Sequence, residues 1–385
     1  MDTLRRARGG TSVIFAVHGA VTGTFAARVP WIADHVGTGA GGLGVALLMP
    51  GVGALLAMPL SGRLAHRYDL RSLTRVLILF WCAALVLPSL PTSLVVLCLV
   101  LIAYGATAGI ADVAMNAQAV IIEERYGRSV MSSFHGFWSV GGLAGSAVAA
   151  LAARAGLDAR IHFLVTAAAL AVVALAASAR LLPHRPEPEI DAPPAFALPS
   201  RAVLPIGLVA LCAVFAEGAG LDWSAVYVRD VVGDAASTAA LTVSVFSVSM
   251  ALARFAGDRV IHRLGPVATV RLAGAAASAG ALIVVLGERT VPVILGFGLM
   301  GAGIAVVVPL VFATAGRIGE HPGRSLAGVA GIAYGSGLVA PGIIGGIAHL
   351  TSLTVSFVMV TALTVAMGLA ARVLRPAPVR AVPQE

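Results

Sequence analysis

Residues 94–119 read LVVLCLVLIAYGATAGIADVAMNAQA, a run in which Asp112 is the only charged side chain. A helix of about 20 mostly apolar residues is long enough to cross a hydrocarbon core roughly 30 Å thick. The run lacks the alternation of apolar and polar residues that marks a membrane strand, and its backbone polar groups cannot stay unpaired in lipid. It is therefore predicted to form a transmembrane helix.

The rest of the chain has the same character. Of its 385 residues 58% are hydrophobic and 11% are charged, and the mean hydropathy is +0.94. Soluble domains carry roughly a quarter charged residues, so a water-soluble protein is excluded. The 26 basic residues, all arginine, are scattered between apolar runs and do not gather on one face, so no nucleic-acid partner is expected.

Arginine, proline and acidic clusters divide the chain into further apolar segments of membrane-spanning length. We predict an all-α membrane protein with twelve transmembrane helices, located approximately at 12–32, 42–61, 73–91, 94–119, 130–151, 160–182, 203–227, 237–257, 267–287, 291–315, 324–347 and 352–373.

The arginines also predict the orientation of these helices. A cytoplasmic N-terminus places 21 of the 26 arginines on the cytoplasmic side, leaving outside only Arg28, Arg154, Arg160, Arg229 and Arg289. Both termini are then cytoplasmic, in a bacterial inner membrane. The connection 183–201 carries six prolines and resists helix formation. We expect a six-helix half over 1–182, a linker over 183–201, a second half over 202–375 and a tail over 376–385.

The two predicted halves share a register of 196 residues, which indicates an internal repeat. Arg63, His66, Arg67 and Arg75 correspond to Arg259, His262, Arg263 and Arg271. The same offset relates other positions near the ends and within the spans: Asp34 and Gly37 to Asp230 and Gly233, Gly105 to Gly301, and Glu124, Gly127, Arg128 and Ser129 to Glu320, Gly323, Arg324 and Ser325.

Two parallel six-helix repeats joined by a linker resemble the major facilitator superfamily, whose halves rock around a central site. The segments 62–71 and 257–265 are similar to the cytoplasmic gate motif of that superfamily, with His66 and His262 where the family usually has aspartate. Asp69 and Asp258 lie close enough in sequence to substitute. The resemblance implies a gate that pairs arginines with acidic residues, formed by Arg63, His66, Arg67, Glu124, Arg128, Arg259, His262, Arg263, Glu320 and Arg324. The alternative is that these arginines reflect membrane topology alone.

Ionisable residues at membrane depth are costly and usually face a cavity or a partner. The clearest are Asp112 and Glu217, and the 196-residue offset relates them to Val308 and Val21, so they are not part of the repeated scaffold. Others are Asp222, His18, His135, Arg28 and, near a cytoplasmic end, Arg254.

Asp112 and Asn116 are four residues apart and share one helical face. The stretch from Asp112 to Asn116 resembles the fourth span of the fucose permease branch, and the segments 133–138 and 216–223 are similar to poorly characterised bacterial relatives of that permease. In the superfamily spans 1, 4, 7 and 10 line the central cavity. The resemblance therefore implies that Asp112, Glu217 and His18 are candidates to face it.

A carboxyl group that moves between a wet cavity and a dry interface can take up and release a proton. We interpret Asp112, Glu217 and His135 as candidates for proton coupling. The candidates for substrate binding are Asn116, His18, Arg28, Asp222 and Trp138. The alternatives are a permanent bond of Asp112 to His135 or Asn116, interfacial anchoring by Asp222 and Arg28, and packing histidines.

No cofactor or metal is expected, and the chain is not expected to be an enzyme. Residues 296–301 fit GxGxxG, but the surrounding strand and helix pattern of a dinucleotide site is missing, so helix packing is the better interpretation. No phosphate-binding GxxxxGK[ST] occurs, and the three cysteines have no metal-ligand spacing.

The leading hypothesis is a proton-coupled symporter that moves a small polar solute, a sugar or related metabolite, by alternating access as a monomer in the lipid bilayer. Proton-driven multidrug efflux is the second hypothesis, although the segment 141–146 lacks the proline of the efflux motif and the similar Pro341–Gly342 pair lies in the eleventh segment. A receptor or scaffold that does not transport is the third.

Overall fold

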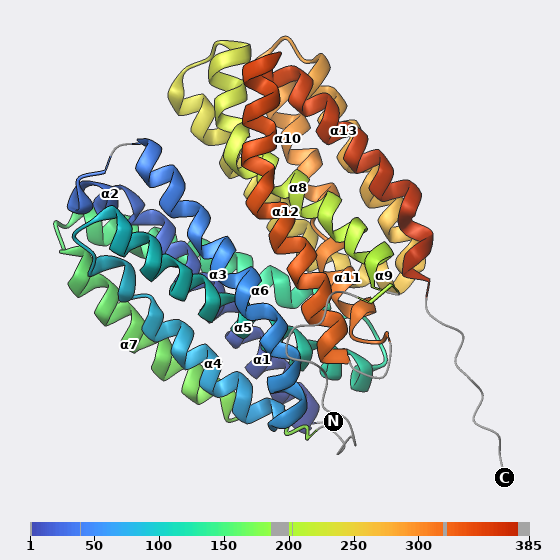
Figure 1. The fold of residues 1–385 in the computed structure, drawn as a ribbon. Coiled ribbons are helices and arrows are strands. Elements are labelled where there is room, and N and C mark those ends of the chain that lie inside the picture. Colours follow the sequence, from blue (N-terminus) through green and yellow to red (C-terminus); the bar gives the residue numbers. More distant parts are fainter. Residues whose placement is uncertain (1, 39, 186–199, 202, 319–321, 376–385) are drawn as a thin grey trace.

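The computed structural model describes residues 2–38, 40–185, 200–201, 203–318 and 322–375, and these fold almost entirely into helices (Figure 1). The first group of helices is α1 (Asp2–Ala27), α2 (Val29–Val36), α3 (Ala40–Arg67), α4 (Leu70–Ala84), η1 (Leu87–Ser89), α5 (Leu94–Tyr126), α6 (Met131–Arg154) and α7 (Ala159–Ser178). The second is α8 (Leu204–Tyr227), η2 (Val228–Val232), α9 (Ala236–Leu286), α10 (Thr290–Ile304), α11 (Val307–Ala315), α12 (Pro322–Leu350), α13 (Leu353–Leu369) and η3 (Ala370–Leu374).

The predicted all-α membrane fold is confirmed. Within the described ranges no residue lies in a strand, and ten helical segments are long and apolar enough to cross a membrane by length and composition. One of them covers residues 241–286, and α3 contributes a further, shorter apolar stretch, Gly42–Met58. A count of twelve depends on adding α3 and on dividing α9, so that number stays a prediction.

Helix α9 is broken where the eighth and ninth segments were predicted to separate. Gly265 has a φ of 75° and a ψ of 168°, which is not helical, and Pro266 follows it. Glycine adopts a positive φ without the steric cost of a Cβ, and proline has no N–H for the helical ladder. The chain therefore turns there without an intervening loop.

The first helix begins earlier than its predicted apolar segment. Helix α1 starts at Asp2 and includes Arg5, Arg6 and Arg8, whereas the predicted segment starts at residue 12. The sequence rule recognises the part of a helix that can lie in hydrocarbon. Arginine is a good helix former, so the helix itself continues beyond the membrane segment.

The helices form two groups that pack side by side (Figure 1). Within the first group α1 packs on α6 and α3 packs on α5, and within the second α9 packs on α10 and α8 packs on α12. Glycines allow the close approach in the first group, because a Cβ at Gly141 of α6 would overlap the backbone of Ala16 on α1. Small residues at such crossings are the usual means of packing membrane helices.

The structure repeats some contacts at the offset found in the sequence. A Cβ at Gly105 would meet the backbone of Pro50 on α3, and a Cβ at Gly301 would meet Phe246 on α9. Pro50 and Phe246 are themselves 196 residues apart. Gly37 and Gly233, another matched pair, both have a positive φ, of 67° and 81°. The offset therefore relates matching contacts and turns in the two groups.

The groups approach each other at the end of the bundle at which α1 begins, here called the α1 end (Figure 1). Between the groups α3 packs on α12 and α6 packs on α9. Residues 186–199, most of the predicted linker, and 376–385, the predicted tail, lie outside the described residues. The domain boundaries therefore remain predictions.

Candidate functional site

Three side chains of the first group form a hydrogen-bonded chain. The His135 Nε2–H of α6 donates to Asn116 Oδ1 at 3.2 Å, and Asn116 Nδ2 of α5 donates to Asp112 Oδ1 at 3.2 Å. Asn116 Nδ2 also donates to the Asp112 carbonyl at 2.9 Å, as the four-residue spacing on one helix allows. Asp112 and Asn116 are buried and His135 is half-buried. The chain thus leads from an imidazole to a buried carboxyl group.

His18 of α1 forms a second polar contact in the same group. Its Nε2–H donates to the Ala108 carbonyl of α5 at 3.3 Å, and its Nδ1 accepts from Trp138 Nε1 of α6 at 3.0 Å. One ring nitrogen donates and the other accepts, which is the pattern of a neutral imidazole. His18 also stacks on Trp81 of α4, with 5.1 Å between ring centroids. This arrangement joins three helices to α1 and fits a positioning role for His18.

The second group contributes an ion pair. Arg254 Nη2 of α9 lies 3.2 Å from Glu217 Oε1 of α8 and 3.3 Å from Oε2, and Arg254 Nη1 donates to Ser139 Oγ of α6 at 2.7 Å. The Arg254 side chain is 4% exposed and that of Glu217 is 20% exposed. Because Ser139 belongs to the first group, the guanidinium joins the two groups as well as pairing with the carboxylate.

Both polar clusters lie where the two groups face each other. The ring centroids of His135 and Phe312 of α11 are 6.1 Å apart, and Asp112 interacts electrostatically with Tyr334 of α12. His135 also interacts electrostatically with Arg254. The structure therefore brings together Asp112, Asn116, His135 and Glu217 from the predicted set, with His18 and Trp138 adjacent to them.

The sequence model of the Major Facilitator Superfamily matches residues 11–337. The chain belongs to this superfamily. It is 35% identical over 369 residues to the uncharacterized transporter y4wD of Sinorhizobium fredii, covering 95% of this chain and 97% of that protein. As a member of this superfamily, the protein is a multi-pass membrane transporter with a small-molecule substrate. It is not an enzyme, as predicted.

Solved structures of the superfamily share the fold. The proton:xylose symporter XylE bound to 6-bromo-6-deoxy-D-glucose has a TM-score of 0.72 at 12% identity, covering 96% of this chain and 95% of that one. The transporter FucP in the outward conformation has a TM-score of 0.66 at 15% identity, covering 96% and 99%. At these identities the likeness concerns the fold alone, and the predicted resemblance to the superfamily is confirmed by the match of the sequence model.

Two predicted substrate residues lie apart from the clusters. Arg28 follows α1 and donates to the Leu157 carbonyl at 3.0 Å. It lies ten residues beyond His18 along the chain, which corresponds to about 15 Å of helical rise. Asp222 lies five residues beyond Glu217 on α8 and is exposed. Neither is joined to Asp112 or Glu217 by a contact in the described residues, so their predicted roles rest on sequence alone.

At the α1 end, Asp258 of α9 joins the groups by capping α6. Its carboxylate accepts from Ser132 N at 3.0 Å, Ser133 N at 3.1 Å and Ser129 Oγ at 3.3 Å. A carboxylate at a helix N-terminus satisfies unpaired N–H groups and complements the helix dipole. Ser132 Oγ returns a bond to the Arg254 carbonyl at 2.6 Å. Asp258, which the sequence suggested as a substitute for the motif aspartate replaced by His262, therefore bridges the halves.

Asp69, the residue suggested as a substitute for the motif aspartate in the first motif, makes its contacts within one half. It caps α4 by accepting from Ser72 N at 3.0 Å, and it also accepts from His184 N at 2.9 Å. Burial alone would raise the pKa of Asp69, but these hydrogen bonds, a bond from Ser72 Oγ and the charge of Arg185 together lower it. Asp69 therefore fixes the start of α4 as a carboxylate and makes no described contact across the halves.

An ion pair that the sequence did not predict also crosses the halves. Arg317 Nη2, just after α11, lies 2.9 Å from Glu123 Oε1 of α5, and Glu123 Oε2 accepts from Val130 N and Met131 N at 2.9 Å each. The predicted partner, Glu124, is exposed. The acidic pair Glu123–Glu124 was visible in the sequence, but only the helical rotation decides which of the two faces the other half.

The other predicted gate residues surround this end. Arg63 and His66 lie in the last turns of α3, and Glu320 lies outside the described residues. Arg324 is half-buried in α12 with its Nε buried and without a described partner. The remaining members are exposed: Arg67, Arg128, Arg259, His262 and Arg263. Their gating role stays a prediction.

Proposed function

We propose that the chain is a secondary active transporter that moves a small polar solute, a sugar or related metabolite, across the bacterial inner membrane by alternating access coupled to protons. The observation that carries this proposal is the hydrogen-bonded chain His135–Asn116–Asp112, in which the His135 ring lies against Phe312 of the other half, with 6.1 Å between ring centroids. A buried carboxyl group at the interface of two moving halves changes its surroundings during each cycle, and so it can bind and release a proton.

The distribution of contacts supports one state of that cycle. Asp258 and Arg317 join the halves at the α1 end. With the N-terminus in the cytoplasm, as the arginine distribution predicts, these contacts lie on the cytoplasmic side and support an outward-facing state. We expect the transporter to work as a monomer. Arg254 then links the central ion pair to the same closed interface through Ser139.

The substrate class rests on the polar groups that this interface offers. Asn116 and Ser139 can donate to or accept from hydroxyl groups, the Trp138 N–H can donate, and Glu217 and Arg254 compensate each other's charge. Such a set suits a neutral polar solute better than a large cation. Multidrug efflux is the alternative, and a thermal-shift panel of sugars, organic acids and cationic drugs on the purified protein separates the two.

The coupling is tested with Asp112→Asn in proteoliposomes loaded with the solute that the panel identifies. The amide keeps the shape of the side chain but cannot exchange a proton, so solute exchange should continue while accumulation driven by a pH gradient disappears. Asp34→Asn, the same change at an exposed residue of α2, should behave as wild type.

A folded Asp112→Asn protein that accumulates solute with the pH dependence of wild type would transfer the proposed role to Glu217, for which Glu217→Gln repeats the assay. Loss of exchange and accumulation together would indicate a structural charge. Absence of any flux with the whole panel would favour the receptor hypothesis.

A further inference from the structure

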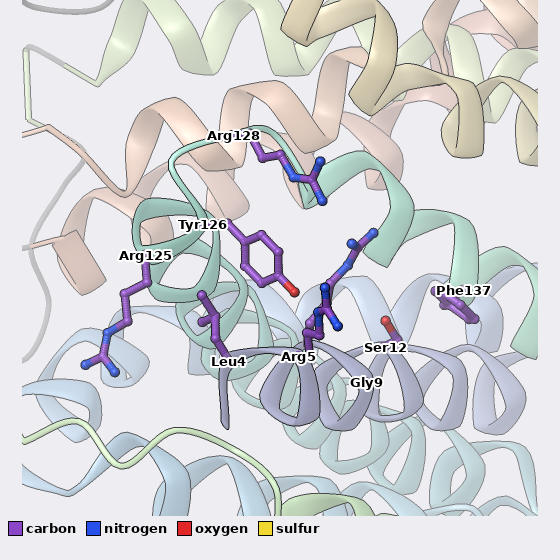
Figure 2. A pocket seen from close by; sticks show the side chains of 9 residues that line it. Leu4, Arg5, Gly9, Ser12, Arg125, Tyr126, Arg128 and Phe137 are labelled. Carbon is purple, nitrogen blue, oxygen red and sulfur yellow. The ribbon is translucent and has the colours of Figure 1, made fainter. Parts of the chain in front are cut away.

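A cavity of about 670 Å³ opens at the α1 end between α1, the end of α5 and the start of α6 (Figure 2). Its polar lining consists of Arg5, Arg8, Ser12, Arg125, Tyr126 and Arg128. The transport site is made by other residues, deeper between the halves. The cavity therefore needs an explanation of its own.

The charge of this lining has one sign. Four of the residues around the cavity are arginines, and none of its lining residues is a carboxylate. Among the described residues none of these four arginines forms an ion pair. Topology explains why arginines occur at this end of the chain, but it does not explain why four of them line one cavity, where like charges repel each other.

Tyr126 organises two of the guanidinium groups. The guanidinium carbons of Arg8 and Arg128 each lie 5.6 Å from the centroid of its ring, an arrangement in which the ring face stabilises the cations. In Figure 2 the side chains of Arg5 and Tyr126 point toward each other and that of Arg125 points away. The cavity thus presents planar N–H donors and a phenol hydroxyl before any ligand is present.

We propose that this cavity binds a phosphate-bearing anion through Arg5, Arg8 and Arg128, with the Tyr126 hydroxyl as a further donor. Arginine pairs with phosphate oxygens through two parallel N–H bonds, and such charge-assisted bonds are the strong ones. The phosphate belongs either to the headgroup of an anionic lipid in the facing leaflet or to a soluble phosphate ester. The exposed ring of Phe137 at the edge of the cavity suits the first source.

The site also adjoins the contact between the halves. Arg8 Nη2 donates to Ser133 Oγ at 3.4 Å, and the Ser133 N–H donates to Asp258. A bound phosphate would compete with Ser133 for the Arg8 guanidinium. Ser133 therefore connects occupancy of the cavity with the Asp258 contact. This anion site is separate from the transported solute and does not depend on the proposed coupling.

The test measures thermal unfolding of the purified full-length protein in a zwitterionic detergent. The probes are phosphatidylglycerol, phosphatidylcholine, and inorganic phosphate against sodium chloride at equal ionic strength. The variant Arg5→Gln/Arg128→Gln removes two charges from the cavity. Its control, Arg6→Gln/Arg180→Gln, removes two exposed arginine charges that do not line the cavity.

An anion that fills the site should raise the unfolding midpoint of wild type and control by about 3 °C or more, and that of the cavity variant by less than half as much. Protection by phosphatidylglycerol alone assigns the lipid source, and protection by inorganic phosphate alone assigns the soluble source. Tyr126→Phe, which keeps the ring, should weaken the response several-fold without unfolding the protein. Equal responses of the cavity variant, Tyr126→Phe and the control to both anions would overturn the proposal.

Discussion

The two halves of the molecule share their packing and differ in their charges. Gly105 meets Pro50 in the first half, and Gly301 meets Phe246, at the corresponding positions, in the second. The charged residues of the central site have apolar counterparts instead: Asp112 corresponds to Val308, Glu217 to Val21 and Arg254 to Met58. The repeat thus supplies a symmetric frame, and each half adds different polar groups to it.

This difference distinguishes residues that the repeated fold needs from charged residues that only one half carries. A charge inside the membrane costs roughly 2.5–3.5 kcal/mol or more, so a fold that needs only packing has no reason to keep one. The second copy of the same frame folds with valine where the first has Asp112. The frame therefore does not require that carboxyl group, and this agrees with the transport role that we propose for Asp112.

The largest expected effect comes from giving the second half the apolar residues of the first. Arg254→Met leaves the Glu217 carboxylate without its partner, which should cost about 3–5 kcal/mol of folding free energy. The double variant Glu217→Val/Arg254→Met removes both charges and should recover most of that loss, because the repeated frame accepts these residues at Val21 and Met58. Thermal unfolding of both proteins measures the difference.

Transport separates the two roles of this pair. The double variant should fold but lose solute flux, since the polar groups of the second half are gone. A double variant that is no more stable than Arg254→Met would show that the two side chains do not act as a pair.

The matched glycines are expected to differ next. A Cβ at Gly105 would overlap three backbone atoms of Pro50, whereas a Cβ at Gly301 would lie 2.7 Å from the Phe246 carbonyl oxygen and 2.9 Å from its ring. The overlap at Gly105 is deeper and involves three backbone atoms, whereas that at Gly301 is shallower and partly with a ring, so Gly105→Ala should cost about 3 kcal/mol and Gly301→Ala about 1 kcal/mol, within the range of overpacked cores.

Gly44→Ala, on α3 with open space at its Cβ, is the control and should be neutral or stabilising by up to about 1 kcal/mol. The three unfolding midpoints measured in one detergent rank these effects. Equal losses at both matched sites would mean that the halves pack more alike than their contacts show.

A smaller effect is expected where the halves touch. Asp258→Ala removes the acceptor of three hydrogen bonds from the start of α6, and bonds to a charged group are worth roughly 1.5–3 kcal/mol each. The closed state at the α1 end should therefore lose at least tenfold in population, seen as longer spin-label distances across that end. Arg317→Gln should shift the population less than about fivefold, because that side chain is 49% exposed.

Asp69→Ala is the control for this comparison. Asp69 caps α4 within one half, so its loss should leave the spin-label distances as in wild type. A change as large as that of Asp258→Ala would mean that loss of any helix cap opens this end.

Much of the fold follows from the sequence, because membrane helices are selected by length and hydrophobicity alone. The break at Gly265–Pro266 was also predictable as a boundary between two apolar segments. Helix ends in water were not, since α1 extends through arginines that the hydropathy rule excludes. The 196-residue offset already related the glycines that make matching contacts and turns in the two halves.

The site was predictable in composition but not in pairing. Asp112 and Asn116 were linked by their spacing on one helix, and His135 was considered as a partner of Asp112. In the structure His135 bonds to Asn116, which in turn bonds to Asp112. Arg254 was noted only as a charge near a helix end, and its pairing with Glu217 depends on how α8 and α9 rotate about their axes. Contacts within one helix can be predicted from the spacing of residues in the sequence, whereas contacts between helices depend on how the helices pack.

The smallest expected effect concerns the repeated arginines themselves. Arg67 and Arg263 occupy matched positions and both are exposed, with the Arg67 guanidinium 5.8 Å from the centroid of the Tyr68 ring. If they act in the gate, Arg67→Ala and Arg263→Ala should each shift the balance of the two states a few-fold, since exposed charges interact weakly. Solute affinity within a fixed state should stay the same, because neither residue is near the central site. Spin-label distances across the α1 end, recorded for both variants beside Arg6→Ala as an exposed control, measure that shift. Distance distributions identical to wild type in both variants would reduce the repeated arginines to markers of topology and leave gating to Asp258 and the Glu123–Arg317 pair.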